Sequence, residues 1–317
     1  MEHIIERSLN GTYLPADIAS EIRTRMNRRA DYRPVMTVHG KNRNAVLYVG
    51  FPPKQGHLLE RIHQRLGFFA DMFPHKEIRV VFFPTQHKKM LPKSKKASIN
   101  VPHINSAMTT QFPHDPSLDN VIIYREEESP KVLCHELCHL LNLDVAFSRK
   151  DDDYFRRKYN LRTPCYLSEV YCEVVGTLLN VYDYASSDTR SHRMERFREL
   201  YTVERTYMLY KTAQILEHYD IHHPTDLHKL TSDTNTLTYT VMKCAYLLTV
   251  EREHDMVSFV KRLIDTKLYI SEKTFREHIE DGFDRLFKEC QVLHRIFKDS
   301  SPPPKSLDST LRLTIVE

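Results

Sequence analysis

The sequence predicts an α+β fold, with a small mixed sheet in its N-terminal part followed by a mainly helical lobe. Two patterns lead to this fold class. Up to about residue 125, short runs rich in β-branched and aromatic residues are bounded by turn-forming residues, which is typical of strands. After Asn142, apolar residues recur at helical spacing over most of the remaining chain. The first pattern predicts the sheet, and the second predicts the helical lobe.

Five runs have the composition of strands. They are residues 34–39, 45–49, 77–83, 104–110 and 120–124. The first two are separated by a polar turn, which predicts a hairpin. The runs EIRVVFF (77–83) and NVIIY (120–124) are largely apolar and predict buried strands, whereas 104–110 lies in a polar stretch and predicts an edge strand.

Apolar spacing predicts one helix beside these strands, over residues 58–72, which Pro74 ends. A second helix should begin where three glutamates and Pro130 follow the last strand, because acidic residues and an early proline favour a helix N-terminus. Further helical patterns cover residues 167–181, 191–218, 236–249, 255–266 and 271–297. We therefore expect an N-terminal lobe over 1–145, a helical lobe over 146–299 and a flexible, proline-containing tail over 300–317.

Composition excludes several classes of function. The net charge of +4 is small beside 46 basic and 42 acidic residues, so charge predicts neither a nucleic-acid nor a membrane partner. The N-terminal residues lack the pattern of a signal peptide, and no apolar run reaches transmembrane length. We therefore expect an intracellular, cytoplasmic protein whose six cysteines are free thiols. With 7 glycines, the chain lacks a glycine-rich phosphate loop, which argues against nucleotide binding.

The second predicted helix contains the motif HELCH, residues 135–139. His135 and His139 are four residues apart, so they lie on one face of a helix and can bind a single metal ion. Glu136 would project beside that ion, where it can accept a proton from a water as a general base. Zinc lowers the pKa of a bound water to about 7. The motif therefore predicts a zinc-dependent hydrolase with Zn2+ as its cofactor.

A catalytic zinc needs a third protein ligand and an open position. The otherwise apolar run 167–176 carries Glu169 and Glu173, and buried carboxylates need a partner or a metal. We assign Glu169 as the third ligand and Glu173 as an acceptor for the ring N–H of a ligating histidine. Two alternatives stay open. The two glutamates could have the reverse roles, or both could be exposed and form ion pairs at the surface. Asp144 and the run 151–153 are weaker candidates because their surroundings are polar.

HExxH followed by ExxxE on a second helix resembles the gluzincin group of zinc metallopeptidases, which includes thermolysin-like peptidases and zinc aminopeptidases. The resemblance covers residues 130–181 and implies a zincin-like fold. In that group the first glutamate of the second motif binds the metal, which implies this role for Glu169. The chain departs from better-known members, because Ser168 stands where an asparagine is usual and no GxMEN-type motif precedes the first helix. Aminopeptidase specificity is therefore not implied.

A looser resemblance covers residues 104–248. The phrases INSAMTT, VIIYREEE, HELCHLLNLD, SEVYCEVVGTLLN and TYTVMKCAYLL look like uncharacterised proteins of the metallopeptidase type encoded by large DNA viruses. This likeness implies a viral protein located in the host cytoplasm or in the virion. It brings no known substrate.

Two further features of a zincin site can be sought in the sequence. Zincins bind peptide main chain along an edge strand, for which residues 104–110 are the candidate, and they place a donor to stabilise the oxyanion. We assign Tyr239 to that role, with His222 and His223 as alternatives. A structural zinc site that includes Cys134 is disfavoured, because its side chain is rotated about 100° from that of His135 around a regular helix.

The first hypothesis is therefore a zinc metallopeptidase that hydrolyses peptide bonds in a peptide or protein substrate, with Glu136 as general base. An alternative is a catalytically inactive zincin-fold protein with a binding or structural role, which would not need Glu136. A zinc amidase acting on a nonpeptide substrate would use the same chemistry. The sequence does not distinguish endopeptidases from exopeptidases, and it predicts no oligomeric state.

Overall fold

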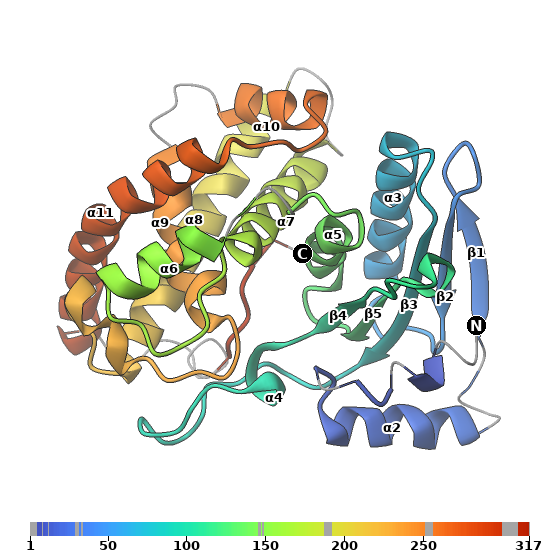
Figure 1. Cartoon of the computed structure of the whole chain (residues 1–317), viewed down its shortest axis with the longest axis horizontal. Coiled ribbons are helices and arrows are strands. Elements are labelled where there is room, and N and C mark those ends of the chain that lie inside the picture. Colours follow the sequence, from blue (N-terminus) through green and yellow to red (C-terminus); the bar gives the residue numbers. More distant parts are fainter. Residues whose placement is uncertain are drawn as a thin grey trace. The chain divides into compact units, whose positions relative to one another are not determined.

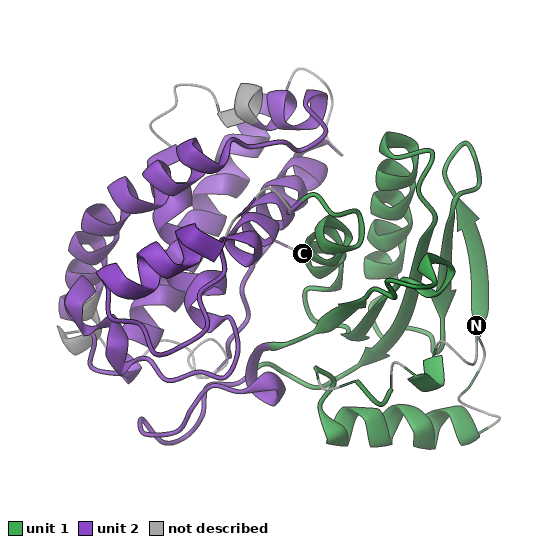
Figure 2. Cartoon of the chain, in the orientation of Figure 1, with its two compact units in different colours: residues 1–89, 105–143, 317 green, residues 90–104, 144–316 purple. Residues whose placement is uncertain are grey.

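The structure is a computed structural model with two compact units. It describes residues 5–7, 9–11, 13–28, 32, 34–144, 147, 149–186, 192–250, 256–299 and 310–316. Unit 1 comprises residues 1–89, 105–143 and 317, and unit 2 comprises residues 90–104 and 144–316 (Figure 2). The lobes expected from the sequence, 1–145 and 146–299, stay a prediction.

Unit 1 contains the predicted mixed sheet. Its strands are β1 (Val35–His39), β2 (Ala45–Val49), β3 (Ile78–Thr85), β4 (Ala107–Thr110) and β5 (Asn120–Arg125). Their order is β1-β2-β3-β5-β4, with β2, β3 and β5 parallel and the outer strands β1 and β4 antiparallel to their neighbours. The β1–β2 hairpin and the edge strand β4 confirm two expectations from the sequence. The fold class, α+β with a helical second part, is also confirmed.

Helices cover both faces of this sheet. In Figure 1, α3 (Gly56–Met72) and α5 (Ser129–Leu140) lie on one side and α2 (Ala16–Asn27) lies on the other. Alternate strand residues form one apolar cluster with α2: Tyr48, Val81, Phe83, Met108, Ile122 and Tyr124 pack with Ile18, Ala19 and Ile22. Because both faces are covered, β3 and β5 are buried along their lengths, which explains their continuous apolar runs.

The sequence did not predict α2. Only Ile18, Ala19 and Ile22 are buried in this helix, so its apolar stripe is too short to give a clear period. A 3-10 turn, η1 (Pro116–Leu118), precedes β5 and was also not expected.

Unit 2 is mainly helical. It contains α4 (Val101–Ile104), α6 (Arg149–Lys158), α7 (Leu167–Ser186), α8 (Arg193–His218), α9 (Lys243–Val250), α10 (Met256–Asp265) and α11 (Glu272–Asp299). A 3-10 helix, η2 (Pro224–Lys229), and a π-helix, η3 (Thr238–Met242), lie between α8 and α9. The helix expected over 236–249 is thus a π-helical turn that continues into α9. Helix α6 was missed because only Asp151 and Phe155 are buried in it, which leaves no apolar period.

Residues 310–316 are the described part of the tail that the sequence led us to expect over 300–317. Thr310 forms a β-bridge with Met90, and Leu311, Leu313 and Val316 are buried in unit 2. Residues 300–309 and 317 lie outside the described part of the chain. Among the described residues, none of the helices has the length and apolar character needed to cross a membrane.

The closest approach of α11 to α9 provides a test of the packing. A Cβ atom added at Gly282 would lie 2.0 Å from the carbonyl oxygen of Ala245, which is backbone and cannot rotate away. Gly282→Ala should therefore lower the free energy of unfolding by about 1–3 kcal/mol. Gly67→Ala in α3 is the matched control, because nothing lies within 4 Å of its added Cβ. The control should raise stability by up to about 1 kcal/mol. Thermal unfolding followed by circular dichroism measures both, and equal midpoints would contradict the close approach.

Candidate metal centre

The N-terminus of α5 is fixed by buried charge. Glu128 adopts a left-handed conformation (φ 61°) just before the helix, and its fully buried carboxylate forms an ion pair with the buried Lys89 ammonium. The carboxylate of Glu127 accepts a hydrogen bond from the Lys89 main-chain N–H (3.1 Å). The carboxylate of Glu126 accepts one from the Gln55 main-chain N–H (2.6 Å) at the start of α3. The acidic run expected at a helix N-terminus thus also connects α5 to two other segments of unit 1.

The C-terminus of α5 is held by the segment that follows β4. The side-chain N–H of Gln111 donates to the carbonyl oxygen of His139 (3.1 Å) and to the side-chain oxygen of Asn142 (3.1 Å). Asn142 adopts a left-handed conformation (φ 55°), and its main-chain N–H also donates to the His139 carbonyl (3.0 Å). A left-handed residue is the common way to end a helix. The motif helix is therefore anchored at both ends within unit 1.

The two motif histidines point their outer ring nitrogens at one another. The Nε2 atoms of His135 and His139 are 3.2 Å apart, and the ring planes meet at 71°. A tetrahedral zinc ion with Zn–N bonds of about 2.0–2.1 Å separates two ligand nitrogens by about 3.3 Å. The same spacing suits an N–H···N hydrogen bond when no ion is bound. The histidine pair therefore fits a divalent metal without rearrangement.

Glu136 is buried beside this pair, and an edge-strand hydroxyl fixes its orientation. Thr109 Oγ1 donates to Glu136 Oε2 (2.7 Å) and lies 3.0 Å from the Glu136 carbonyl oxygen. Thr109 belongs to β4, so the edge strand contacts the candidate base directly. Sequence reasoning missed Thr109, since no local pattern pairs it with a residue 27 positions away. The INSAMTT run was predicted to be an edge strand that binds substrate, without a role for the Thr109 side chain.

Tyr124 lies near Glu136 but is not an acid–base candidate. Burial raises the pKa of its phenol far above the ordinary value, the Glu136 charge adds to this shift, and the Arg125 charge opposes it. Its hydroxyl donates to the carbonyl oxygen of Tyr13 (2.9 Å). The phenol therefore stays protonated and serves the structure of unit 1.

Residues that could hold a metal ion are present on α5 and α7, namely His135, His139 and Glu169. Neither Cys134 nor Cys138 belongs to this set, and in the described part of the chain the six cysteines are buried and form no disulfide.

Glu173 is buried on α7, four residues after Glu169. Its Oε2 atom accepts a hydrogen bond from the ammonium of Lys243 (3.2 Å), and both side chains are almost fully buried. A buried carboxylate with a cationic partner is the arrangement expected when charge is removed from water. The predicted role of Glu173 as an acceptor for a histidine N–H stays a prediction. Lys243 was not singled out from the sequence.

The weaker aspartate candidates in unit 2 have other partners. Asp151 pairs with Arg276 (2.7 Å), and Asp152 accepts a hydrogen bond from the Leu167 main-chain N–H (2.8 Å) at the start of α7. Burial raises the pKa of Asp152, and the Leu167 N–H opposes the shift. These carboxylates stabilise α6 and the first turn of α7.

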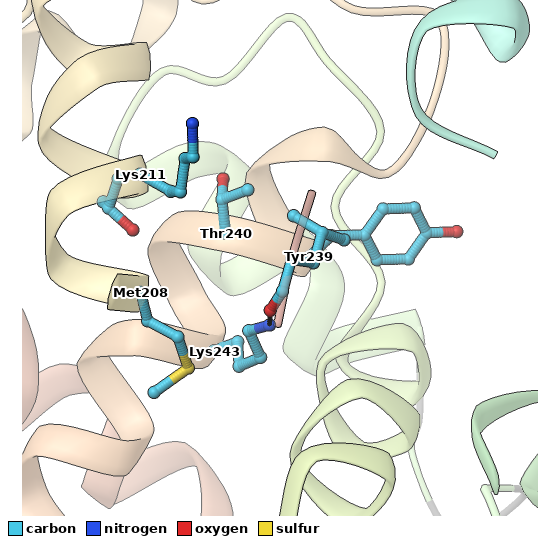
Figure 3. Close-up of a pocket in the computed structure, with 7 residues that line it drawn as sticks. Met208, Lys211, Tyr239, Thr240 and Lys243 are labelled. Carbon is cyan, nitrogen blue, oxygen red and sulfur yellow. Dashed lines mark hydrogen bonds between the residues drawn. The ribbon is translucent and has the colours of Figure 1, made fainter. Parts of the chain in front are cut away.

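Tyr239, the residue assigned to the oxyanion, lies in the π-helix η3 and is half-buried. Single π-helical turns occur frequently at functional sites. Figure 3 shows its ring directed away from Lys211 and Thr240, which line a small hollow in unit 2. The alternatives are exposed: His222 pairs with Asp220 (3.0 Å) and His223 caps η2. The role of Tyr239 stays a prediction.

Comparison with known proteins finds a distant viral relative of the chain. No family model matches the chain, and no solved structure matches it. An uncharacterised protein, R210, of Acanthamoeba polyphaga mimivirus is 24% identical over 199 residues, which are 57% of this chain and 49% of that protein. The matched region thus spans about half the length of the mimivirus protein. The chain is similar to a viral protein whose activity is not described.

The buried ion pair before α5 gives a test of how the motif helix is held. Lys89→Met should destabilise the protein by about 3–5 kcal/mol, because it leaves the carboxylate of Glu128 buried without its cation. Lys88→Met is the matched control, since Lys88 is 61% exposed and lies 3.9 Å from Glu127. The control should cost less than about 1 kcal/mol. Chemical denaturation measures both changes, and similar values for the two variants would show that the buried pair does not hold the helix.

Proposed function

We propose that the protein is a zinc-dependent metallopeptidase, with His135, His139 and Glu169 as zinc ligands and Glu136 as general base. The observation that carries the proposal is the pair of Nε2 atoms 3.2 Å apart on one face of α5, next to a carboxylate held in place by a hydroxyl. A histidine pair alone would suit many structural roles. A buried, oriented glutamate directly after the first histidine suits hydrolysis.

The proposed donor set favours zinc. Two imidazoles and one carboxylate are the three protein ligands of many hydrolytic zinc sites, and they leave one position open. Bound there, zinc supplies Lewis acidity and lowers the pKa of a water to about 7. Glu136 would accept the proton from that water and pass it to the leaving amine. Thr109 would hold the Glu136 carboxylate in one orientation during both transfers.

A peptide or protein is the proposed substrate, because of β4. This strand pairs with β5 on one side only and forms an edge of the described sheet. An extended peptide can add to such an edge by main-chain hydrogen bonds. In the proposed mechanism, Tyr239 donates to the oxyanion. The mimivirus relative supports a viral protein. We further propose that it acts in the host cytoplasm or is carried in the virion.

Metal content tests the ligand assignment. Purified protein should contain about one zinc per chain, and His135→Ala, His139→Ala and Glu169→Gln should each remove most of it. Glu173→Gln should retain zinc, and His222→Ala serves as a control at an exposed histidine. Elemental analysis and chelator titration give the readout. If Glu169→Gln retains zinc and Glu173→Gln loses it, the roles of the two glutamates are exchanged. Wild-type protein without zinc would refute the proposal.

Hydrolysis of a labelled casein and of a peptide library tests the chemistry. Glu136→Gln should keep zinc while the rate falls by a factor of about 10²–10⁴, the contribution of a general base. Thr109→Val should lower the rate about tenfold, because the carboxylate loses its orienting hydroxyl, and Thr109→Ser should restore it. Thr110→Val, the next residue of β4, is the matched control.

Two results of the same assay would favour the alternatives. Full zinc content without any hydrolysis in the wild type would point to an inactive zincin-fold binding protein. Hydrolysis of nonpeptide amides alone would point to a zinc amidase. An unchanged rate in Glu136→Gln would remove this residue from the mechanism.

A further inference from the structure

Side chains of unit 2 bind the main chain of residues 310–316, which we call the strap. The donors come from three different helices. Lys211 Nζ donates to the carbonyl of Thr310 (2.8 Å), Tyr207 Oη to that of Arg312 (3.3 Å), Lys243 Nζ to that of Leu313 (3.2 Å) and Asn180 Nδ2 to that of Val316 (2.7 Å). Side-chain hydrogen bonds thus hold the strap at four main-chain carbonyl groups.

Glu204 on α8 accepts hydrogen bonds from the strap. Its carboxylate is fully buried and its Oε2 atom accepts hydrogen bonds from Thr314 Oγ1 (2.8 Å), the Ile315 N–H (3.0 Å) and the Val316 N–H (3.3 Å). Burial raises the pKa of Glu204, whereas the Lys243 charge and these donors lower it. Without the strap, the carboxylate would lose three donors in a buried site, which is costly.

Lys243 connects the strap to the elements that carry the unit 2 part of the proposed site. Its buried ammonium lies 3.2 Å from both the Leu313 carbonyl and the Glu173 carboxylate. Glu173 lies one helical turn after Glu169 on α7, and Lys243 immediately follows the π-helix that contains Tyr239. The ammonium of Lys243, which directly follows η3, thus contacts both the strap and α7.

The hollow beside Lys243 does not provide a better explanation for this arrangement. Lys211, Thr240 and Lys243 line it together with Leu313 of the strap (Figure 3). Two lysines beside a hollow could indicate an anion site. Both ammonium groups, however, donate to strap carbonyls, and Lys243 also pairs with Glu173. The lysines are therefore already engaged with the strap.

We propose that Lys243 is a positioning residue, and that the strap, by fixing Lys243, holds α7 and η3 in the arrangement that presents Glu169 and Tyr239. This inference rests on the proposed function for the roles of Glu169 and Tyr239. The coupling of the strap to α7 through Lys243 does not depend on a metal. An experiment can therefore refute the coupling through Lys243 without refuting the proposed zinc site, and the reverse.

The test uses the full chain and a mild change in the strap. Thr314→Val removes one donor to Glu204 and leaves the main chain intact, whereas Thr314→Ser keeps the hydroxyl. Ile315→Val is the control, because the Ile315 side chain is 38% exposed. Hydrogen exchange of the α7 and η3 amides and the rate of zinc release to a chelator are measured. Thr314→Val should accelerate both about tenfold, the serine variant should restore them, and the control should change neither.

Lys243→Met provides the second arm, with Lys211→Met as its matched control. Both lysines donate to the strap, but only Lys243 contacts Glu173. Exchange in α7 should rise more in Lys243→Met than in Lys211→Met. If Lys243→Met does not fold, the Thr314 variants still decide the question.

The outcomes separate the two proposals. Faster exchange in the strap with unchanged exchange in α7 and η3 would overturn the inference, and zinc binding by the wild type would then still support the proposed function. Wild-type protein without zinc would refute the proposed function. In that case the exchange measurements alone would still confirm or refute the coupling through Lys243.

Discussion

Compensation of buried charge is the constraint on which both parts of the candidate site depend. A charged group removed from water destabilises a fold by several kcal/mol unless a partner and hydrogen bonds replace the solvent. In unit 1, the Lys89–Glu128 pair meets this requirement directly before the motif helix. In unit 2, Lys243 meets it for Glu173 on α7. Each helix that carries a proposed zinc ligand is therefore attached to its own unit by a buried ion pair, and neither helix can shift without separating opposite charges.

Local patterns were sufficient to predict the strands and the motif helix. Two histidines four residues apart share a helix face in any α-helix, so their common face follows from the spacing once the helix forms. The 3.2 Å separation of their Nε2 atoms also depends on the side-chain rotamers. The buried strands β3 and β5 were predictable for a similar reason, since both faces are covered and every residue is apolar or sheltered. Helices α2 and α6 bury too few side chains to produce a period, and so the sequence does not reveal them.

The tertiary partners could not be predicted from one sequence. Thr109 and Glu136 are 27 residues apart, Glu173 and Lys243 are 70 apart, and Glu204 and Thr314 are 110 apart. Periodicity shows which face of an element is buried, but it does not show which of many polar residues will lie opposite. Glu126 and Glu127 illustrate the ambiguity. Their position suited a helix N-terminus, yet their carboxylates accept hydrogen bonds from main-chain groups in other segments, which a helix-dipole argument cannot anticipate.

In the proposed function, the edge strand β4 has two roles that its geometry combines. Its outer main chain would bind an extended substrate, and the Thr109 side chain holds Glu136. Strand residues alternate between faces while their main-chain groups point sideways, so one short strand can pair with a peptide and contact α5 at the same time. A peptide hydrogen-bonded along β4 would restrict the motion of that strand and therefore of the Thr109 hydroxyl. Orientation of the base would then improve when substrate is bound, because binding and proton transfer depend on the same four residues, Ala107–Thr110.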